Sequence, residues 1–257
     1  PSRVIPYAYR PFDTRFVYDD PRIWTRAVSR LRARIDGEPL LLATRFARDG
    51  AFAHVFATRL LPDVIFLSNK TSVNCFAFPR AALRVEAARD ALGDAPERNA
   101  FFAYLYAILH ATRYRERYAP AFAEGFPRIP MPTSRASFDR LAALGERLLA
   151  LHLDEPVDAP ATPTVPDAIR TASARDLACF ESFAGASWHA RVGGYQVCHK
   201  WLLDRARAGR TLDAAERARF ASLVRALDAT RACIVELDAA VELIAPAWAA
   251  APPSQSA

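Results

Sequence analysis

Residues 104–132 read YLYAILHATRYRERYAPAFAEGFPRIPMP, and this stretch decides how the interior of the fold is organised. Residues 100–109 carry no charge, so a helix there is apolar on every side and belongs inside a domain. The chain turns basic over residues 113–117, and Pro120 is expected to end the helix before a stiff, proline-rich exit. A buried rod with a cationic tip suits the binding of an anion, although a core helix with a hydrated end has the same pattern.

The segments on either side of this stretch are also predicted to be helical. Asp94 and Glu97 have the spacing of a capping box, and Pro96 between them suits a first helical turn. We therefore expect the apolar helix to run from about residue 95 to about residue 118. Two further helices are expected at residues 81–92, closed by Gly93, and at residues 134–152.

Between residues 39 and 79 the pattern changes to short runs of strand type. The runs 40–44, 53–57 and 64–67 are apolar or alternating, and glycine and proline separate them. They predict a small, mostly antiparallel sheet. Residues 68–74 then form a polar loop whose amide, hydroxyl and ammonium groups suit either contacts to base edges and phosphates or an ordinary surface turn.

Residues 7–18, YAYRPFDTRFVY, interleave arginines with aromatic rings. Arg10 precedes a proline and is therefore held extended, and the residues after Asp13 are predicted to form a strand. Arginine and aromatic side chains in this pattern stack on bases or contact phosphates. Alternatively, Arg10 or Arg15 pairs with Asp13 while the rings fill the core. The arginine-rich segment 20–35 that follows has helical spacing.

The last long helix is expected to begin where Asp213 and Glu216 have the spacing of a capping box. Before it, Gly193 and Gly194 are expected to open a helix that Gly209 stops. Apolar positions of the last helix alternate spacings of four and three, which indicates a packing seam with Thr230 as its one polar member. The seam consists of Leu223, Leu227, Thr230, Ile234, Leu237, Val241 and Ile244.

Together these patterns predict an α+β fold in two lobes. The N-terminal lobe contains a small, mostly antiparallel sheet and helices, and the C-terminal lobe is helical with the long seam helix. Residues 154–166 contain four prolines among small or polar neighbours, as a linker does. The predicted divisions are a mixed α/β lobe at 1–153, the linker at 154–166, a helical lobe at 167–251 and a disordered tail at 252–257.

The net positive charge suits a polyanionic partner such as a nucleic acid but does not by itself establish one. The chain has 257 residues, 52% of them hydrophobic, and a net charge of +6, and its pI is about 9.4. Only Lys70 and Lys200 among the 34 basic residues are lysines, so the arginine content partly reflects a GC-rich genome. The absence of an initial methionine at Pro1 indicates a piece of a longer polypeptide.

The four cysteines, Cys75, Cys179, Cys198 and Cys233, form no CxxC pair, so we expect reduced thiols and no metal. No run of 18 uncharged apolar residues and no signal-peptide pattern is present, so we expect a cytoplasmic protein without a membrane span.

Motifs of common catalytic sites are missing from the sequence. There is no glycine-rich phosphate loop, no HExxH and no GxSxG, and the Asn-Pro-Pro-Tyr type of motif of adenine methyltransferases is missing too. The five histidines each stand alone in an apolar or helical setting, and no acidic pair suggests a general acid and base. We therefore expect this chain to catalyse nothing by itself.

Several longer motifs, taken in order, resemble one family over nearly the whole chain. That family is the C-terminal target-recognition (specificity) domain of type ISP restriction-modification enzymes and related adenine-specific DNA methyltransferases. The sequence departs from the family's pattern in two places. One is the proline-rich linker, and the other is an alanine-rich segment at residues 80–93, where the family tends to have an extended chain. The matching motifs are Tyr9–Arg15 (YRPFDTR), Phe52–Thr58 (FAHVFAT), Phe78–Pro79, Ala103–Pro132, Leu144–Gly145, Leu151–Leu153, Gly193–Val197, Lys200–Leu202 with Arg205, and Gly209–Arg210 with Leu212.

The resemblance implies a bacterial DNA-binding protein. The domain would bind double-stranded DNA, read an asymmetric site and present a target adenine to an upstream methyltransferase domain of the same polypeptide. That domain would use S-adenosylmethionine and flip the base, and ATP with Mg²⁺ would serve the parent if it also restricts phage DNA. The missing upstream domains leave open whether the parent restricts or only methylates.

Candidate DNA contacts divide into two groups under this resemblance. Shared motifs suit backbone contacts, whereas base readers vary between specificities and are expected in the loops. The backbone candidates are Arg10, Arg15, Arg45, Arg113, Arg115, Arg117, Arg128 and Lys200. The base-reading candidates are Ser68, Asn69, Lys70, Thr71, Asn74 and Gln196.

Two other classes of function compete with DNA recognition. A protein-interaction or scaffolding module of a larger DNA-processing or phage-defence protein would use the apolar seam helix at residues 214–245. A contiguous arginine-rich face would count against that class. A self-sufficient enzyme has only the size of the chain in its favour.

Overall fold

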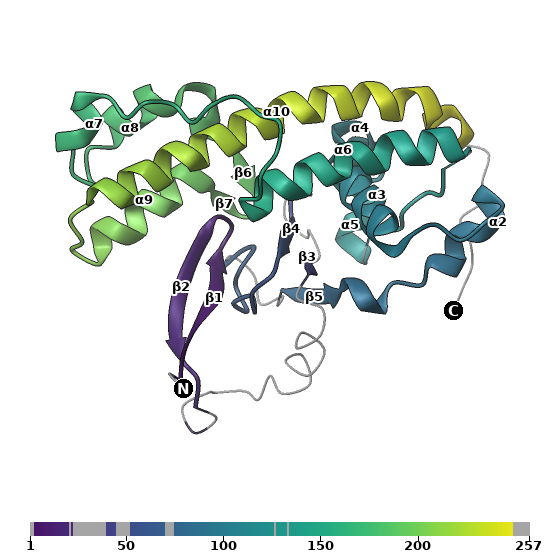
Figure 1. Ribbon diagram of the computed structural model, residues 1–257, viewed down its shortest axis with the longest axis horizontal. Helices are drawn as coiled ribbons and strands as arrows, with labels where there is room; N and C mark the ends of the chain where they lie inside the picture. Colours follow the sequence, from purple (N-terminus) through teal and green to yellow (C-terminus); the bar gives the residue numbers. More distant parts are fainter. Residues whose placement is uncertain are drawn as a thin grey trace.

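The computed structural model describes residues 3–20, 22, 40–44, 52–69, 75–125, 127–132 and 134–248. The fold is α+β as predicted, with small antiparallel sheets in the N-terminal part and helices after them (Figure 1). Helix α10 (Ala214–Trp248) extends across most of the width of the molecule, with α6 (Arg135–Leu153) beside it and the sheets beneath (Figure 1).

Two sheets form the N-terminal part. Strands β1 (Val4–Arg10) and β2 (Asp13–Tyr18) make an antiparallel hairpin. In the second sheet β3 (Leu41–Thr44) lies between β4 (Val55–Thr58) and β5 (Phe76–Pro79), and both pairings are antiparallel. The antiparallel sheet, the strands near residues 40–44 and 53–57, and the strand after Asp13 are therefore confirmed.

The strand predicted at residues 64–67 is wrong, because this segment forms turns. The carboxylate of Asp63 accepts a hydrogen bond from the Ile65 N–H at 2.9 Å, and the Asp63 carbonyl accepts one from the Phe66 N–H at 2.9 Å. Phe66 and Leu67 are buried, which explains their apolar character without a strand. A short apolar run has the same pattern in a strand and in a buried turn.

The apolar helix is α3 (Arg98–His110), and it is buried along nearly its whole length, as predicted. It is shorter than expected, because Ala111 adopts an extended backbone with ψ of 125°. Two short helices follow, α4 (Thr112–Arg117) and α5 (Ala119–Glu124). Pro120 lies in the first turn of α5, where its missing N–H is not needed, so the prediction that it ends a helix is wrong.

The predicted capping box at Asp94 and Glu97 is also wrong. Glu97 precedes α3 without a side-chain cap, and Asp94 accepts a hydrogen bond from Arg135 at 2.9 Å instead. Residues 80–92 form η1 (Arg80–Ala82), η2 (Val85–Ala88) and α2 (Arg89–Leu92) rather than one helix. Gly93, with φ of 85°, closes α2 as predicted.

Helix α6 agrees with its prediction, and Gly145 fixes how closely it packs. Ser134 caps its N-terminus by accepting a hydrogen bond from the Ser137 N–H at 3.2 Å. A Cβ atom on Gly145 would lie 1.9 Å from the carbonyl oxygen of Ala103 in α3. Only glycine permits this approach, so α3 and α6 pack backbone against backbone.

The residues after the predicted linker form α7 (Asp167–Thr171), α8 (Leu177–Ala184), η3 (Gly185–His189) and α9 (Val197–Arg207). The α9 helix is stopped by Gly209 at φ of 65°, as predicted. Asp213 caps α10 by accepting a hydrogen bond from the Glu216 N–H at 2.8 Å, which confirms the predicted start of that helix.

Gly193 and Gly194 do not open α9, contrary to the prediction. They form the turn between β6 (Arg191–Val192) and β7 (Tyr195–Gln196). Gly193 has φ of 58°, and a Cβ atom there would lie 2.0 Å from the Leu67 carbonyl oxygen. The glycines therefore let this hairpin press against the turn that follows Asp63.

Helix α10 belongs to two hydrophobic clusters. Leu223 and Leu227 pack with α8 and α9, whereas Leu237 and Val241 pack with α3 and α6. The predicted seam is thus shared between the N-terminal and C-terminal parts of the chain. The helix predicted at residues 20–35 and the tail at 252–257 fall almost entirely outside the described residues, as does the side chain of Ile244.

Candidate nucleic-acid interface

The turn of the β1–β2 hairpin is inserted into the body of the protein. Phe12 has φ of 62°, which is costly for a residue with a large side chain. Its ring packs edge-on against Phe56, with centroids 4.9 Å apart, and against His152 at 5.5 Å. These contacts hold the turn in place, and the opposite end of the hairpin extends away from the helices (Figure 1).

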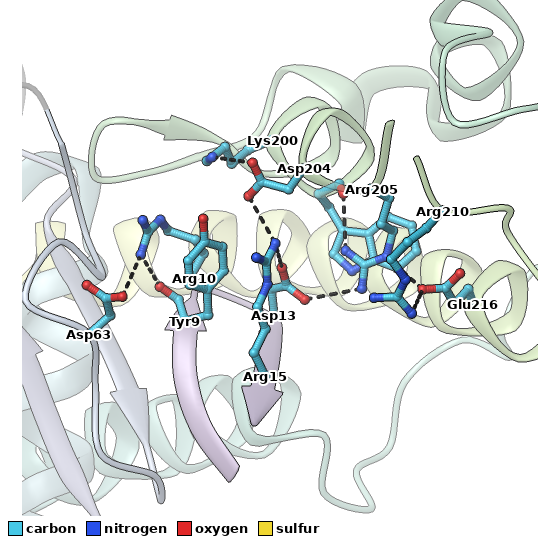
Figure 2. A network of polar contacts seen from close by, with 11 residues as sticks. Tyr9, Arg10, Asp13, Arg15, Asp63, Lys200, Asp204, Arg205, Arg210 and Glu216 are labelled. Carbon is cyan, nitrogen blue, oxygen red and sulfur yellow. Dashed lines mark hydrogen bonds and ion pairs between the residues drawn. The ribbon is translucent and has the colours of Figure 1, made fainter. Parts of the chain in front are cut away.

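Buried ion pairs join the hairpin to α9 (Figure 2). Asp13 accepts a hydrogen bond from Arg205 at 3.2 Å and also pairs with Arg15 at 3.5 Å. Asp204 pairs with Arg15 at 3.4 Å and with Lys200 at 2.6 Å. Each of the two buried carboxylates therefore has two cationic partners, as burial of a charge requires.

The same network continues into α10. Glu216 pairs with Arg205 at 3.2 Å and with the exposed Arg210 at 2.7 Å (Figure 2). The guanidinium of Arg205 also lies 3.3 Å from the centroid of the Trp201 ring. The β1–β2 hairpin at the start of the chain is thus fixed to the last two helices, α9 and α10.

We call this network of ion pairs between the hairpin, α9 and α10 the hairpin anchor. Arg10 extends it on the other side of Tyr9. It is buried, pairs with Asp63 at 3.6 Å and donates to the Tyr9 carbonyl (Figure 2). Arg10, Arg15 and Lys200 lie 3.9, 3.6 and 6.0 Å from the centroid of the Tyr9 ring. Three of the predicted DNA-backbone residues are therefore brought together, and each has a carboxylate partner inside the protein.

The hairpin also has an exposed apolar face. Val4 pairs with Tyr18, and Pro6 pairs with Phe16, so the four side chains lie on one side of the two strands. Phe16 is 70% exposed, Val4 50% and Tyr18 49%. Exposed aromatic rings on a firmly held hairpin are suited to stacking on bases.

The three arginines of α4 have different surroundings. Arg115 points inward, where its Nε–H donates to the Leu109 carbonyl at 2.6 Å, and burial lowers the pKa of its guanidinium to about 10. Arg113 is exposed but lies 3.9 Å from Glu116 and 3.8 Å from Glu242. Arg117 is exposed, as is Arg128 after α5.

The base-reading candidates are only partly described. Asn69 is exposed, whereas Ser68 is buried against the Gly193–Gly194 turn. Gln196 is half-buried and donates from Nε2 to the Trp188 carbonyl at 2.8 Å. Lys70, Thr71, Asn74 and the backbone candidate Arg45 lie outside the described residues.

A chain of hydrogen bonds runs from β4 through α3 and α6 to α10. The Tyr106 hydroxyl accepts from the Ala57 N–H at 3.1 Å and lies 2.5 Å from His152 Nδ1, so it donates to that nitrogen. His152 Nε2–H then donates to the Thr230 hydroxyl at 3.0 Å. This explains the one polar residue in the α10 seam. Burial, aided by Arg115, lowers the pKa of His152 to about 3, so the ring is neutral.

His110 lies beside this chain, with its ring centroid 5.3 Å from that of His152. These two histidines, which stand alone in the sequence, are therefore neighbours in the fold, and both are buried and hydrogen-bonded. His110 Nδ1 lies 2.8 Å from the Tyr106 carbonyl, so Nδ1 carries the proton. Burial and the nearby Arg115 hold the pKa of His110 well below its ordinary value.

The anchor residues Asp204, Arg205, Glu216 and Asp63 were missed as a group by the sequence interpretation. Only Lys200 and Asp204, four residues apart on one helix, have a spacing that indicates a pair. The pairing of Asp13 with Arg205 joins opposite ends of the chain, and no local pattern reports it.

Within the described part of the chain, no group of three or more histidine, cysteine or acidic residues could hold a metal ion. None of the helices in the described part of the chain has the length and apolar character needed to span a membrane.

Comparison with known proteins identifies relatives for this fold. A family model described as Type ISP C-terminal specificity domain matches residues 1–233. No curated protein matches the chain. The structure of a nuclease-deletion mutant of the Type ISP restriction-modification enzyme LlaGI, in complex with a DNA substrate mimic, has a TM-score of 0.58 and 17% identity over 93% of this chain.

Two further solved structures share the fold. The DrdV–DNA complex has a TM-score of 0.59 and 24% identity over 95% of this chain. The ATP-dependent Type ISP restriction-modification enzyme LlaBIII bound to DNA has a TM-score of 0.59 and 16% identity over 93% of this chain. The chain spans 24% of the LlaGI chain, 28% of the DrdV chain and 18% of the LlaBIII chain.

Proposed function

The chain belongs to the family of Type ISP C-terminal specificity domains, and we propose that it binds duplex DNA and recognises the target sequence of a restriction-modification enzyme. The observation that carries this proposal is the family match over residues 1–233. Support comes from the LlaGI, DrdV and LlaBIII structures, in which proteins of the same fold are in complex with DNA or a DNA mimic.

The proposal extends to the polypeptide of which this chain is a part. The domain positions a target adenine for N6-methylation by an upstream methyltransferase domain that uses S-adenosylmethionine. ATP and Mg²⁺ belong to the parent if it also restricts DNA, and the LlaBIII relative is ATP-dependent. The chain itself contributes binding and specificity rather than catalysis.

Within the domain the residues divide into an anchor and a contact surface. Arg10, Arg15 and Lys200 support DNA binding indirectly, because their ion pairs fix the hairpin. Phosphate contacts fall to the exposed arginines of α4 and to Arg128. Base contacts fall to Asn69, to the loop residues that follow it and to the aromatic face of the hairpin.

Salt dependence tests the DNA-binding proposal. The log of the association constant for duplex DNA should fall linearly with log salt, by about 0.9 for each phosphate neutralised. Changing Arg113 and Arg117 together to alanine should weaken binding to all sequences alike and reduce that slope by about 1–2. Fluorescence anisotropy with labelled duplexes over a range of salt concentrations measures both quantities.

The matched control changes Arg175 and Arg219, which are exposed on the C-terminal part, to alanine. It removes the same amount of charge but from a different part of the surface. If α4 contacts the phosphates, the control should therefore alter the salt slope less than the α4 variant does. Equal slopes for wild type and both variants would mean that α4 does not contact the phosphates. Absence of any binding at low salt would refute the proposed function itself.

The hairpin face provides a second test. Changing Phe16 and Tyr18 to alanine should leave stability nearly unchanged, because both rings are exposed. Loss of base stacking should weaken DNA binding by about 1–3 kcal/mol for each ring that stacks. Binding titrations at fixed salt, with the Val235→Ala variant as a control for an exposed apolar residue on α10, measure the effect. Unchanged affinity would remove the hairpin face from the interface.

A further inference from the structure

A cavity of about 340 Å³ lies where the N-terminal and C-terminal parts of the chain meet. Its walls come from β4, α3, α4 and α6 on one side and from η3, β6 and α10 on the other. Its described lining includes three arginines and three histidines, which are Arg115, Arg191, Arg231, His110, His152 and His189. No aspartate or glutamate is among the lining residues that the structure describes.

Arg115 is the innermost cation of this cavity. Its Nε–H is satisfied by the Leu109 carbonyl at the end of α3, where a positive charge is favourable. Among the described residues its two terminal nitrogens form no ion pair and no further hydrogen bond, and Asp238, whose negative charge acts on this guanidinium, accepts a hydrogen bond from the Arg113 N–H instead. Burial lowers the pKa of this guanidinium in spite of the favourable charge of Asp238, so an anion in the cavity stabilises the charge further.

The two other arginines lie on the C-terminal side of the cavity and are exposed. Arg231 is held by Asp228 at 3.1 Å, and Arg191 donates to the Gly194 carbonyl at 3.3 Å. Each of these contacts is made by one Nη2 atom, so the remaining N–H groups are available to a ligand. Planar guanidinium groups that converge from two sides match the oxygens of a phosphate.

One of the two neutral histidines adds a hydrogen-bond acceptor without adding charge, because both ring nitrogens of His152 are already bonded to Tyr106 and Thr230. His110 Nε2 carries a lone pair, because Nδ1–H is used by the Tyr106 carbonyl. The remaining lining is largely apolar and includes Val55, Leu227 and Ile234. A mixed wall with a few convergent polar groups is typical of a site for a small molecule.

We propose that this cavity is a binding site for a phosphate group, held by Arg115 from one side and by Arg191 and Arg231 from the other. The phosphate belongs either to a free mononucleotide, whose base packs on the apolar wall, or to the backbone of bound DNA. Because the ligand bridges the two parts of the chain, it also stabilises their arrangement. Only the DNA source rests on the proposed function, and the first test contains no DNA.

Isothermal titration calorimetry of the whole chain with inorganic phosphate and with AMP, at constant ionic strength, is that first test. We expect saturable binding of at least one of them, and the Arg191→Ala, Arg231→Ala double variant should bind about tenfold more weakly or worse. The matched control changes exposed Arg140 and Arg175 to alanine and should bind as the wild type does. The Arg115→Met variant, which keeps the length of the side chain, should also lose binding.

A competition with duplex DNA distinguishes the two sources of phosphate. If DNA supplies the phosphate, inorganic phosphate or AMP should displace DNA, and the Arg191, Arg231 double variant should bind DNA more weakly than its control. If a free mononucleotide is the ligand, AMP should bind equally well to the DNA-bound protein. The inference is overturned if neither phosphate nor AMP binds saturably and the double variant binds DNA as its control does. It is also overturned if any binding persists unchanged in all cavity variants.

Discussion

The Asp13→Ala variant is expected to lose about 3 kcal/mol of folding stability, the lower end of the range for breaking a buried ion pair. Asp13 is 5% exposed, and its carboxylate is the partner of both Arg15 and Arg205. The loss stays at the lower end because Arg205 keeps Glu216 at 3.2 Å, and Arg15 keeps Asp204 at 3.4 Å. Urea denaturation followed by circular dichroism measures the change.

The Asp139→Ala variant is the control for this prediction. Asp139 also pairs with an arginine, Arg135 at 3.0 Å, but both side chains are about half exposed. Water screens a surface pair of this kind, so the control should be nearly as stable as the wild type. Equal stability losses in the two variants would show that the hairpin anchor adds nothing beyond a surface pair. A double-mutant cycle of Asp13 with Arg205 should give a coupling of about 1 kcal/mol or more.

The His152→Gln variant should change how stability depends on pH. The folded pKa of His152 is about 3, and an unfolded histidine has a pKa of about 6.5. As pH falls below the unfolded value, only the unfolded chain takes up the proton, so the wild type loses stability. This residue alone should account for about 2 kcal/mol lost between pH 7 and pH 5. The variant should show a slope that is shallower by up to about 1.4 kcal/mol per pH unit.

Thr230→Val separates the hydrogen bond from the titration. This variant removes the acceptor of His152 Nε2–H but keeps the histidine, so it should lose about 1 kcal/mol and keep the wild-type pH slope. Some slope should remain in His152→Gln, because the pKa of the buried His110 is lowered in the same direction. Denaturation curves at a series of pH values test both variants, and identical slopes for wild type and His152→Gln would contradict the assignment.

Local patterns sufficed for much of the fold. The uncharged run at residues 100–109 predicted a buried helix, and the positions of Ser134, Gly93, Gly209 and Asp213 marked helix ends correctly. These features depend on neighbouring residues only. The errors arose where tertiary contacts decided between local alternatives. A glycine such as Gly193 can precede a helix or lie in a hairpin turn, and the local sequence does not distinguish the two. Its close approach to Leu67 places it in the turn of a hairpin.

The candidate site also combines features that neighbouring residues indicate with features that only tertiary contacts determine. The alternating arginines and aromatics of residues 7–18 marked the hairpin as special, and the suggested pairing of Arg15 with Asp13 is present at 3.5 Å. The partner of Asp13 on α9 is Arg205, almost the whole chain away, so nothing near Asp13 indicates it. The three arginines of α4 look equivalent in the sequence, but the geometry of a six-residue helix turns one inward and two outward.

Selection of DNA from a pool of random-sequence duplexes by this chain, at near-physiological salt, tests the central claim most directly. A specificity domain should enrich one asymmetric site, and that duplex should bind about 10³-fold or more tightly than a scrambled duplex of the same composition. The enrichment should disappear for the Phe16, Tyr18 double variant if the hairpin face reads bases. Binding without enrichment of any site, or no binding even at low salt, would contradict the assignment of target recognition to this domain.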